Sequence, residues 1–476
     1  MLDKRKFYID GEWVDPIKKN DFDVINPCNE DPCAVISLGS TEDTNRAVKA
    51  AKTAFETWKE TSKKERIKLL EKLLTIYKKR FNEMAEAISL EMGAPMDWST
   101  DVQTASGRDH LEDFILRLKN FNFEEHFDEK SNNHICYEPI GVCGLITPWN
   151  WPINQVVSKL APCLASGCTA VLKPSEIAPL SSMVIAEIFH EAGVPKGVFN
   201  LVNGLGPVVG EAMSNHVGID MMSFTGSTRG GIAVARASAN SVKRVCQELG
   251  GKSPNIILDD ENFKISVSEG VKNCMSNTGQ SCNAPTRMLV PKKRYDEALE
   301  IAIEANNKIV TGDPGSDKTD IGPLVSETQY IKVQKLIQSG LDNGANLISG
   351  GLGKPQGLET GYYVKPTIFG GVSNDMEIAR EEIFGPVLCI ITYNDFEDAI
   401  DIANDTEYGL AAYVSGADPN ELMKYARELN AGQIHLNYGS AGSDAPFGGY
   451  KQSGNGREKA EWGLMEYLEV KAIMGK

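Results

Sequence analysis

The stretch from Pro139 to Leu249 contains five short apolar runs: GVCGLIT (141–147), TAVLKP (169–174), VFNLV (198–202), MMSFTG (221–226) and KRVCQEL (243–249). Between them lie longer segments with the apolar spacing of helices, at 152–165, 180–191 and 228–239. Strands that alternate with helices in this way predict a parallel sheet with helices packed on its faces. We therefore expect a doubly wound α/β domain in this part of the chain.

The segments on either side extend this organisation. Apolar residues recur at helical spacing from about 42 to 118, which predicts several helices. Earlier in the chain, FYIDGEWV at 7–14 predicts a short hairpin with its turn at Asp10-Gly11. After Gly250-Gly251 a second alternating series begins with NIIL at 255–258, so we expect a second α/β domain from this point.

Two segments fit neither domain: residues 121–139 and the strand-like run MEYLEVKAIM at 465–474. Each is either an arm that pairs with another subunit or an ordinary edge strand. The pattern alone leaves both interpretations open.

Composition narrows the class of protein. The 476 residues include 49 Lys and Arg against 65 Asp and Glu, a formal charge of −16, which repels nucleic acid and anionic lipid. No run approaches the roughly 18 to 20 apolar residues of a spanning helix, and no secretion signal is evident, so we expect a cytoplasmic protein. The ten cysteines form no C-x-x-C pair and no cluster at metal spacing, so we expect no disulfide framework and no metal site.

Two glycine-rich turns follow predicted strands. The first, GLGPVVG at 204–210, is one residue longer than the dinucleotide fingerprint G-x-G-x-x-G, and it is either a phosphate-binding turn or simply a tight one. The second, FTGST at 224–228, places a hydroxyl and backbone N–H groups at the start of a helix. Such a helix start suits a pyrophosphate.

The run KPSE at 173–176 follows another strand at the same edge of the sheet. Glu176 offers a carboxylate to the ribose hydroxyls of an adenosine, and it would repel a 2′-phosphate, which favours NAD over NADP. Lys173 softens that repulsion. Without the neighbouring turns, both residues would be interpreted as solvated strand-end charges.

Cys282 lies in a connection, because the helical spacing of 264–277 ends at Gly279 and 286–290 has strand character. A free thiol has a pKa of about 8.5, so a nucleophilic cysteine needs help to become a thiolate at neutral pH. Glu248, at a strand end, is the candidate acid or base. The alternative interpretations are a buried structural thiol and a surface carboxylate.

Six motifs occur in one order along the chain: ITPWNWP (146–152), FTGST (224–228), ELGGK (248–252), GQSC (279–282), EEIFGPV (381–387) and PFGGYKQSG (446–454). On these motifs the chain resembles the NAD(P)-dependent aldehyde dehydrogenase superfamily nearly end to end. The resemblance implies a Rossmann-like dinucleotide-binding domain (1–120 and 140–249), a second α/β catalytic domain (250–445) and a small β oligomerisation arm (121–139 and 460–476). It also implies a homodimer or homotetramer in which the arm pairs between subunits.

The resemblance implies a mechanism as well. Cys282 would attack the aldehyde carbon, and the Asn150 side chain with the Cys282 backbone N–H would hold the oxyanion. Hydride transfer to NAD would leave a thioester on Cys282, which water activated by Glu248 would hydrolyse. The implied cofactor contacts are Trp149, Lys173, Ser175, Glu176, Gly206, Gly210, Ser227, Glu382 and Phe384. Taken without the motif, Glu382 would be interpreted as solvent-facing and Phe384 as core.

The implied substrate tunnel departs from part of the family. Positions that some relatives fill with aromatic residues are here Asn154, Ser158, Ser276 and Ala441, while Trp151 and Phe447 remain as apolar walls. We therefore expect a wider and more polar tunnel that disfavours small fatty aldehydes.

Three other functions remain open at this stage. An acylating enzyme would pass the thioester to coenzyme A, but it would not need the hydrolytic base Glu248. A non-catalytic structural relative would not need Cys282, Glu248 and Asn150 together. A redox-sensing cysteine protein is suggested by the cysteine count alone.

Overall fold

The predicted parallel series forms the centre of a large sheet in the first of two lobes. The computed structural model describes residues 1–126, 133–440 and 442–475. Five parallel strands run side by side in the order β12-β11-β8-β9-β10: β8 (Val142–Ile146), β9 (Thr169–Lys173), β10 (Phe199–Leu201), β11 (Met221–Thr225) and β12 (Arg244–Glu248). The expected doubly wound sheet is confirmed.

Short antiparallel strands extend this sheet at both edges. The predicted hairpin forms from β2 (Phe7–Ile9) and β3 (Glu12–Val14), and β2 pairs with β10. Asp10 and Gly11 have φ angles of 56° and 76°, the left-handed geometry that a tight two-residue hairpin turn requires. At the other edge β22 (Gly454–Asn455) pairs with β12 and brings the C-terminal part of the chain back to the first lobe.

Helices cover the first sheet, and their ends follow local sequence signals. Ser40 and Ser62 each form a capping box with the acidic residue three positions later, which starts α1 and α2. Pro152 opens the almost entirely buried α6, and Gly167, with a φ of 94°, ends it. The helices of this lobe are α1 (Thr41–Trp58), α2 (Lys63–Lys79), α3 (Phe81–Met92), α4 (Met96–Trp98), α5 (Ala105–Asn120), α6 (Pro152–Ser166), α7 (Leu180–Ala192), α8 (Glu211–Asn215) and α9 (Thr228–Ser238).

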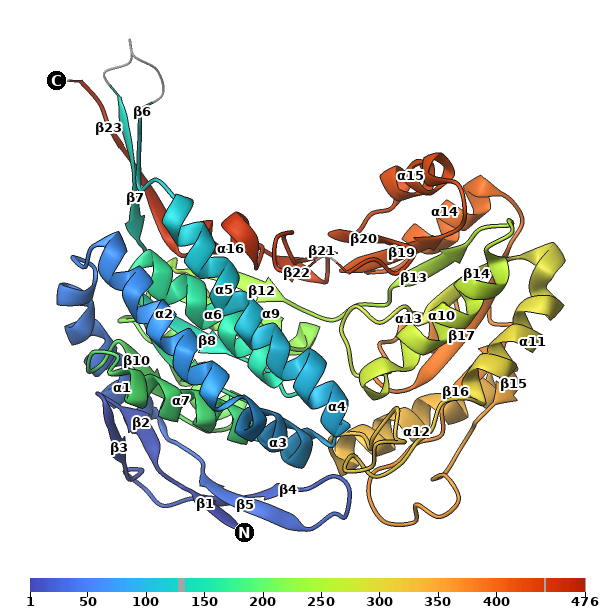
Figure 1. Cartoon of the computed structure of the whole chain (residues 1–476), viewed down its shortest axis with the longest axis horizontal. Helices are drawn as coiled ribbons and strands as arrows, with labels where there is room; N and C mark the ends of the chain where they lie inside the picture. Colours follow the sequence, from blue (N-terminus) through green and yellow to red (C-terminus); the bar gives the residue numbers. More distant parts are fainter. Residues whose placement is uncertain (127–132, 441, 476) are drawn as a thin grey trace.

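The second lobe contains strands that follow Gly250-Gly251. Within the described residues its sheet has seven strands in the order β15-β16-β17-β14-β13-β19-β20, parallel except for β15: β13 (Pro254–Ile257), β14 (Arg287–Pro291), β15 (Asn346–Ser349), β16 (Thr367–Gly370), β17 (Val387–Tyr393), β19 (Ala411–Ser415) and β20 (Gln433–Leu436). Its helices are α10 (Phe263–Met275), α11 (Tyr295–Asn306), α12 (Glu327–Asp342), α13 (Glu377–Arg380), α14 (Phe396–Asn404) and α15 (Pro419–Glu428). Figure 1 shows the two lobes on either side of a gap.

A narrow antiparallel sheet projects from the first lobe (Figure 1). It consists of β6 (Glu124–His126), β7 (His134–Pro139) and β23 (Leu468–Ile473), with β7 in the middle. The two segments expected to form an arm therefore pair with each other within one chain, and their pairing with another subunit stays a prediction. Backbone hydrogen bonding between distant segments of the same chain cannot be inferred from strand character alone. Residues 127–132 of the expected arm lie outside the described residues.

The remaining elements are short. β1 (Leu2–Lys4), β4 (Asp21–Ile25) and β5 (Pro32–Ser37) form a small separate sheet, β18 (Tyr408–Gly409) pairs with β21 (Tyr450–Lys451), and α16 (Ala460–Met465) precedes β23. In the described parts of the chain, no helix has both the length and the apolar character needed to cross a bilayer.

Candidate active site

The carboxyl ends of the central strands of the first sheet gather the predicted residues. The chain leaves β8 into Trp149 and Asn150, leaves β11 into Gly226 and Ser227, and reaches Glu248 at the end of β12. Because β8 and β11 are neighbours although two strands separate them in sequence, the strand order reverses between them. Open α/β sheets bind ligands in the crevice at such a reversal.

The second lobe supplies Cys282 to the same place. Its side chain is half-buried in the loop between α10 and β14. The Asn150 amide donates to the Gln280 carbonyl at 2.9 Å, and the Trp151 indole donates to the Ser281 hydroxyl at 2.9 Å. Two residues that follow β8 therefore hold the loop that carries the thiol.

The loop itself takes an unusual path before Cys282. A 3-10 turn (Ser276–Gly279) follows α10, and Asn277 and Thr278 in it have φ angles of 55° and 56°. The left-handed region is costly for residues with a side chain, about 1–3 kcal/mol each, and it tends to occur where surrounding contacts enforce it. Here the Asn277 amide donates to the Asn150 carbonyl at 3.0 Å, and Gln103 donates to Asn277 at 3.2 Å.

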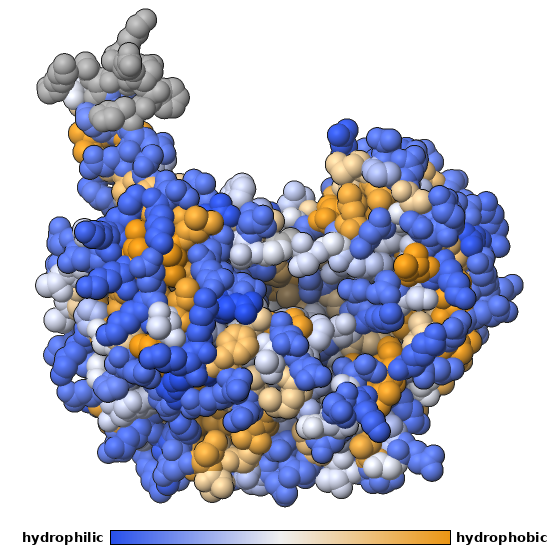
Figure 2. All heavy atoms as spheres, in the orientation of Figure 1, coloured by the Kyte–Doolittle hydropathy of each residue, from blue (hydrophilic) through white to orange (hydrophobic). Residues whose placement is uncertain are grey.

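Two cavities among the described residues meet at the thiol. The larger has a volume of about 890 Å³ and the smaller about 190 Å³. Cys282 and Glu248 line both, together with Gln155 and Thr225. Figure 2 shows the surface hollowed between the two lobes on the viewed face. A molecule in the larger cavity and one in the smaller would thus reach the same sulfur atom.

The larger cavity contains three of the expected substrate contacts. Trp151, Asn154 and Phe447 line it. Ser158 does not, because its hydroxyl lies buried beneath the site and bonds to the Gln155 carbonyl and the Glu458 carboxylate. Ser276 also lies outside the lining, and its hydroxyl donates to the Lys272 carbonyl.

Ala441 lies outside the described residues, and its neighbours Ser440 and Gly442 line the cavity. The cavity also contains residues that sequence reasoning missed. His110 on α5 bonds through Nε2 to the Asn154 side chain at 2.7 Å, and Lys459 enters from the segment before α16. Helical spacing predicted a helix at α5 but did not indicate which of its faces meets α6. The presence of His110 in the cavity therefore could not be predicted. Lys459 lies five residues beyond the PFGGYKQSG motif, and that proximity was the one available signal.

Glu248 is a buried carboxyl group with an unusual environment. Neither of its side-chain oxygens has a hydrogen-bond partner among the described residues. Burial raises the pKa of Glu248 well above its usual range, and the nearby Glu458 carboxylate adds to the effect, while Lys159 opposes it. A carboxyl group with a raised pKa holds its proton to higher pH, and once it has lost that proton it is a stronger base than an ordinary carboxylate.

The Cys282 thiol is also far from its ordinary state. Burial raises its pKa to about 12, and the carboxylates of Glu382 and Glu248 contribute in the same direction. At neutral pH the ligand-free site therefore contains a thiol. Formation of the thiolate needs a base or the removal of negative charge.

Replacing Glu382 by glutamine is expected to lower the pKa of the Cys282 thiol in the enzyme without cofactor. A negative carboxylate disfavours the neighbouring thiolate, so its neutralisation stabilises the thiolate and moves the titration to lower pH. Iodoacetamide alkylation of Cys282, followed by peptide mass spectrometry, should become several-fold faster at a fixed alkaline pH. Glutamine keeps an oxygen for the Gly251 N–H, which bonds to Glu382 at 2.9 Å.

The matched control for this experiment is Glu381→Gln, which alters the exposed neighbour of Glu382. It should leave the alkylation profile nearly unchanged. A profile that stays in place or moves to higher pH in Glu382→Gln would contradict the electrostatic explanation.

The smaller cavity has the features of a cleft for a planar ring and a sugar. The rings of Trp149 and Phe384 lie edge to face with their centroids 5.3 Å apart. Both residues line the cavity together with Ser227 and Glu382. Phe384 has a φ of 62°, and the Gln329 side-chain amide donates a hydrogen bond to the Phe384 carbonyl at 2.7 Å. Ser227 caps the start of α9, so the N-terminus of that helix points into the cleft.

The other expected cofactor contacts lie outside the lining of the smaller cavity, in the chain that follows β9 and β10. Lys173 donates to Glu176 at 3.3 Å, and Ser175 accepts the Ile177 N–H at 3.2 Å. Gly206 and Gly210 bound a π-helical turn before α8. The Gly206 Cα faces open space, whereas Gly210 lies against the Lys173 and Ile146 side chains.

No three His, Cys, Asp or Glu side chains in the described ranges are grouped so as to hold a metal ion. The ten cysteines, all within the described residues, are free thiols.

Comparison with known proteins agrees with the geometry. Residues 13–473 match the model of the aldehyde dehydrogenase family. The chain is 52% identical over 476 residues to a 3-succinoylsemialdehyde-pyridine dehydrogenase of Pseudomonas sp, covering 100% of this chain and 99% of that protein.

Solved structures are equally similar. An aldehyde dehydrogenase from Bartonella henselae has a TM-score of 0.98 and 50% identity, covering 99% of both chains. Aldehyde dehydrogenase C from Pseudomonas syringae, a mutant solved with NAD+ and octanal, has a TM-score of 0.97 and 48% identity, covering 99% of this chain and 96% of that one. These matches confirm the resemblance on which the motifs were interpreted, and this chain belongs to the aldehyde dehydrogenase family.

Proposed function

We propose that this enzyme oxidises an aldehyde to the carboxylic acid with NAD+, using Cys282 as a covalent nucleophile and Glu248 as the base for hydrolysis. The observation that carries the proposal is that two cavities meet at Cys282 and Glu248. One cavity fits an aldehyde and the other fits the reactive end of a dinucleotide. Both reactants would then lie against the same sulfur atom.

The first half of the reaction forms a carbon–sulfur bond. The Cys282 thiol gives up its proton to solvent, and the thiolate adds to the aldehyde carbon, so that the carbonyl oxygen becomes an oxyanion. The Asn150 amide and the Cys282 backbone N–H are the proposed donors to that oxygen; in other enzymes one such donor lowers the barrier by about 3 kcal/mol. The Asn150 amide now donates to the Gln280 carbonyl, so it is already held beside the thiol loop.

The residues around the smaller cavity fit a nicotinamide dinucleotide. Trp149 and Phe384 form an aromatic wall, Ser227 caps the start of α9, and Glu382 offers a carboxylate to a ribose. When bound, NAD+ supplies the acceptor for the hydride that leaves the substrate carbon. The solved complex of the Pseudomonas syringae relative with NAD+ supports this assignment.

The second half hydrolyses the thioester on Cys282. Glu248 takes a proton from water, the resulting hydroxide adds to the acyl carbon, and the thiolate leaves with its electron pair. Because the pKa of Glu248 is raised, the fraction of the free base falls as pH drops through that raised value. Hydrolysis should therefore slow at lower pH.

The larger cavity favours a polar aldehyde. His110, Asn154 and Lys459 line it, opposite the apolar walls Trp151 and Phe447. The 52% identical Pseudomonas relative is named for a pyridine semialdehyde, and the Pseudomonas syringae structure contains octanal. We propose that this enzyme prefers polar or bulky aldehydes to short alkyl ones.

The arm provides a surface for self-association. Val470 and Ile473 of β23 expose 59% and 49% of their surface. We propose that the edges of the β6-β7-β23 sheet pair with a second copy in a homodimer or homotetramer.

The direct test is an assay of purified protein with a panel of aldehydes, NAD+ and no coenzyme A. We expect NADH and the free carboxylic acid, identified by chromatography. A requirement for coenzyme A would instead indicate acyl transfer. Absence of NADH formation across polar, aromatic and alkyl aldehydes would contradict the proposed function altogether.

NAD+ is expected to exceed NADP+ in kcat/KM by about 10-fold or more, because Glu176 would face the 2′-phosphate. The preference is tempered by Lys173, which pairs with Glu176. Steady-state kinetics of Glu176→Gln should show a smaller preference, whereas Glu191→Gln, at an exposed position on α7, should match the unaltered enzyme. An equal preference in the unaltered enzyme would contradict this role of Glu176.

A further inference from the structure

Lys459 stands in a backbone conformation that glycine normally occupies. It precedes α16 with φ 66° and ψ 164°, and the next residue, Ala460, also has a positive φ of 49°. On one side Glu458 pairs with Phe447 through two backbone hydrogen bonds, and on the other the Gly463 N–H bonds to the Lys459 carbonyl at 2.8 Å. Such strain persists where the surroundings enforce it, and it clusters at functional sites.

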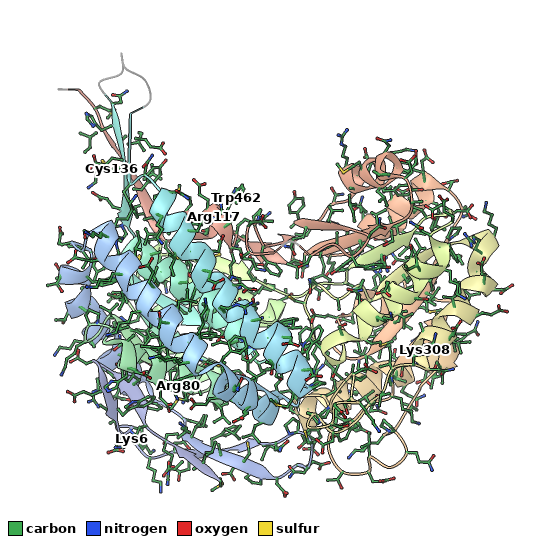
Figure 3. The ribbon with its side chains drawn as sticks, viewed as in Figure 1. Lys6, Arg80, Arg117, Cys136, Lys308 and Trp462 are labelled. Atoms are coloured by element: carbon green, nitrogen blue, oxygen red, sulfur yellow. The ribbon has the colours of Figure 1, made fainter. Side chains whose placement is uncertain are left out.

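This conformation brings the Lys459 side chain into the larger cavity. The half-buried side chain lines the cavity together with Cys282 and Glu248, and its ammonium lies 5.2 Å from the centre of the Phe447 ring. Figure 1 shows α16 on the side of the first lobe next to the gap, and Figure 3 shows Arg117 of α5 and Trp462 of α16 at that rim. The amine is therefore inside the space that the substrate would fill.

The ammonium has no ionic partner there. Among the described residues, no carboxylate lies within ion-pair distance of Lys459 Nζ, and no hydrogen bond from it is found. Most carboxylates that line the cavity are paired with other cations: Asp109 with Arg108, Glu112 with Lys78, Asp113 with Arg117, and Glu458 with Lys159. Three acidic residues in the lining remain: Glu248, Asp101 and Asp444. Of these, Asp101 and Asp444 are exposed to solvent.

Burial lowers the pKa of Lys459, and the carboxylates of Glu458, Glu248 and Asp113 oppose that shift. The nearby imidazole is neutral. Burial lowers the pKa of His110 to about 3, and the positive charge of Lys459 contributes to that shift, so the imidazole is uncharged at neutral pH. Its Nδ1 atom has no partner among the described residues. The cavity thus places the unpaired Lys459 amine among lining residues that include the uncharged His110 imidazole, while the carboxylates of Glu458 and Asp113 are engaged by other cations.

We propose that Lys459 determines substrate specificity by binding a carboxylate at the far end of the aldehyde, so that the preferred substrates are aldehydes that also carry a carboxylate. The inference rests on the proposed function. A carboxylate that is transferred from water into a cavity is stable there only if a cation and hydrogen-bond donors replace its hydration. The cavity contains both. A neutral ester of the same length leaves the ammonium unpaired.

The test compares four-carbon aldehydes that differ at the far end: 4-oxobutanoate, its methyl ester, butanal and 4-(trimethylammonio)butanal. Each is assayed with NAD+ and the unaltered enzyme, with Lys459→Met and with Lys459→Arg. We expect the unaltered enzyme to favour the carboxylate over the methyl ester by about 10-fold or more in kcat/KM. In Lys459→Met that ratio should fall by at least about 10-fold, mainly through KM, and Lys459→Arg should restore most of it.

Lys424→Met is the matched control. Lys424 also lies over a phenylalanine ring, Phe396 at 4.2 Å, but on the exposed face of the second lobe. This variant should keep the carboxylate preference.

Three results would overturn the proposal: an unaltered enzyme that prefers the ester or the cationic aldehyde, a Lys459→Met enzyme with an unchanged ratio, and an equal loss for all substrates. Preference for 4-(trimethylammonio)butanal would show that the carboxylates of Asp101 and Asp444, rather than Lys459, dominate the electrostatics of the cavity. Failure of the proposed function is distinguishable, because then none of the four aldehydes would yield NADH.

Discussion

The Cys282→Ser variant is expected to lose at least about 10⁴-fold in kcat for every aldehyde, the largest effect of any substitution considered. A serine hydroxyl is a much weaker nucleophile and a worse leaving group than a thiolate, so neither half of the reaction proceeds. The measurement is NADH formation at saturating substrate and cofactor. Binding of NAD+ to the variant, measured by calorimetry, should be retained.

The control for this variant is Cys33→Ser. Cys33 is also a half-buried thiol whose pKa is raised by burial, to about 11, but it lies in β5 away from both cavities. Its variant should keep normal turnover. Substantial activity in Cys282→Ser, or an equal loss in Cys33→Ser, would rule out a thioester at position 282.

The Glu248→Gln variant is expected to release NADH in a burst that approaches one per active site and then to stall. Steady turnover should fall by about 10²- to 10⁴-fold, because the thioester waits for a base that has been removed. Glutamine has nearly the same shape, and neither Glu248 oxygen makes a hydrogen bond among the described residues, so the fold should tolerate the change. The burst should become faster as pH rises, since the high pKa of Cys282 limits the thiolate.

Rapid-quench mass spectrometry provides the readout for this second variant. After the burst, the peptide that contains Cys282 should carry the acyl group. Glu261→Gln, at an exposed position, is the control and should turn over normally. Normal steady turnover in Glu248→Gln would remove Glu248 from its proposed role, and an acyl group on another residue would move the nucleophile elsewhere.

Several features were predictable because they depend on local sequence. The hairpin at 7–14 needed residues that accept positive φ, and Asp10-Gly11 supplied them. The parallel strands of the first lobe were recognisable from their continuous apolar runs, and all five positions are fully or largely buried. Cys282 and Glu248 were found through motifs, and the structure brings them to one junction.

The substrate cavity was predicted less completely. Asn154 and Ser158 lie four positions apart on α6, a spacing that puts them on one face, yet Asn154 reaches the cavity and Ser158 bonds to Glu458 beneath it. Small differences in direction along a helix face decide which side chain reaches a cavity. Those differences come from packing against α5 and α16, which the spacing of one helix does not contain.

Sequence by itself predicted two series of alternating strands and helices, and its motifs supplied the proposed catalytic residues, because strand patterns and motifs are local properties of the chain. Tertiary structure alone decided that β7 and β23 pair within one chain, that Ser276 lies outside the lining of the cavity, and that Lys459 lines it. The physical reason is that these outcomes depend on contacts between segments up to hundreds of residues apart. Such contacts fix backbone angles and side-chain directions that no local preference would choose.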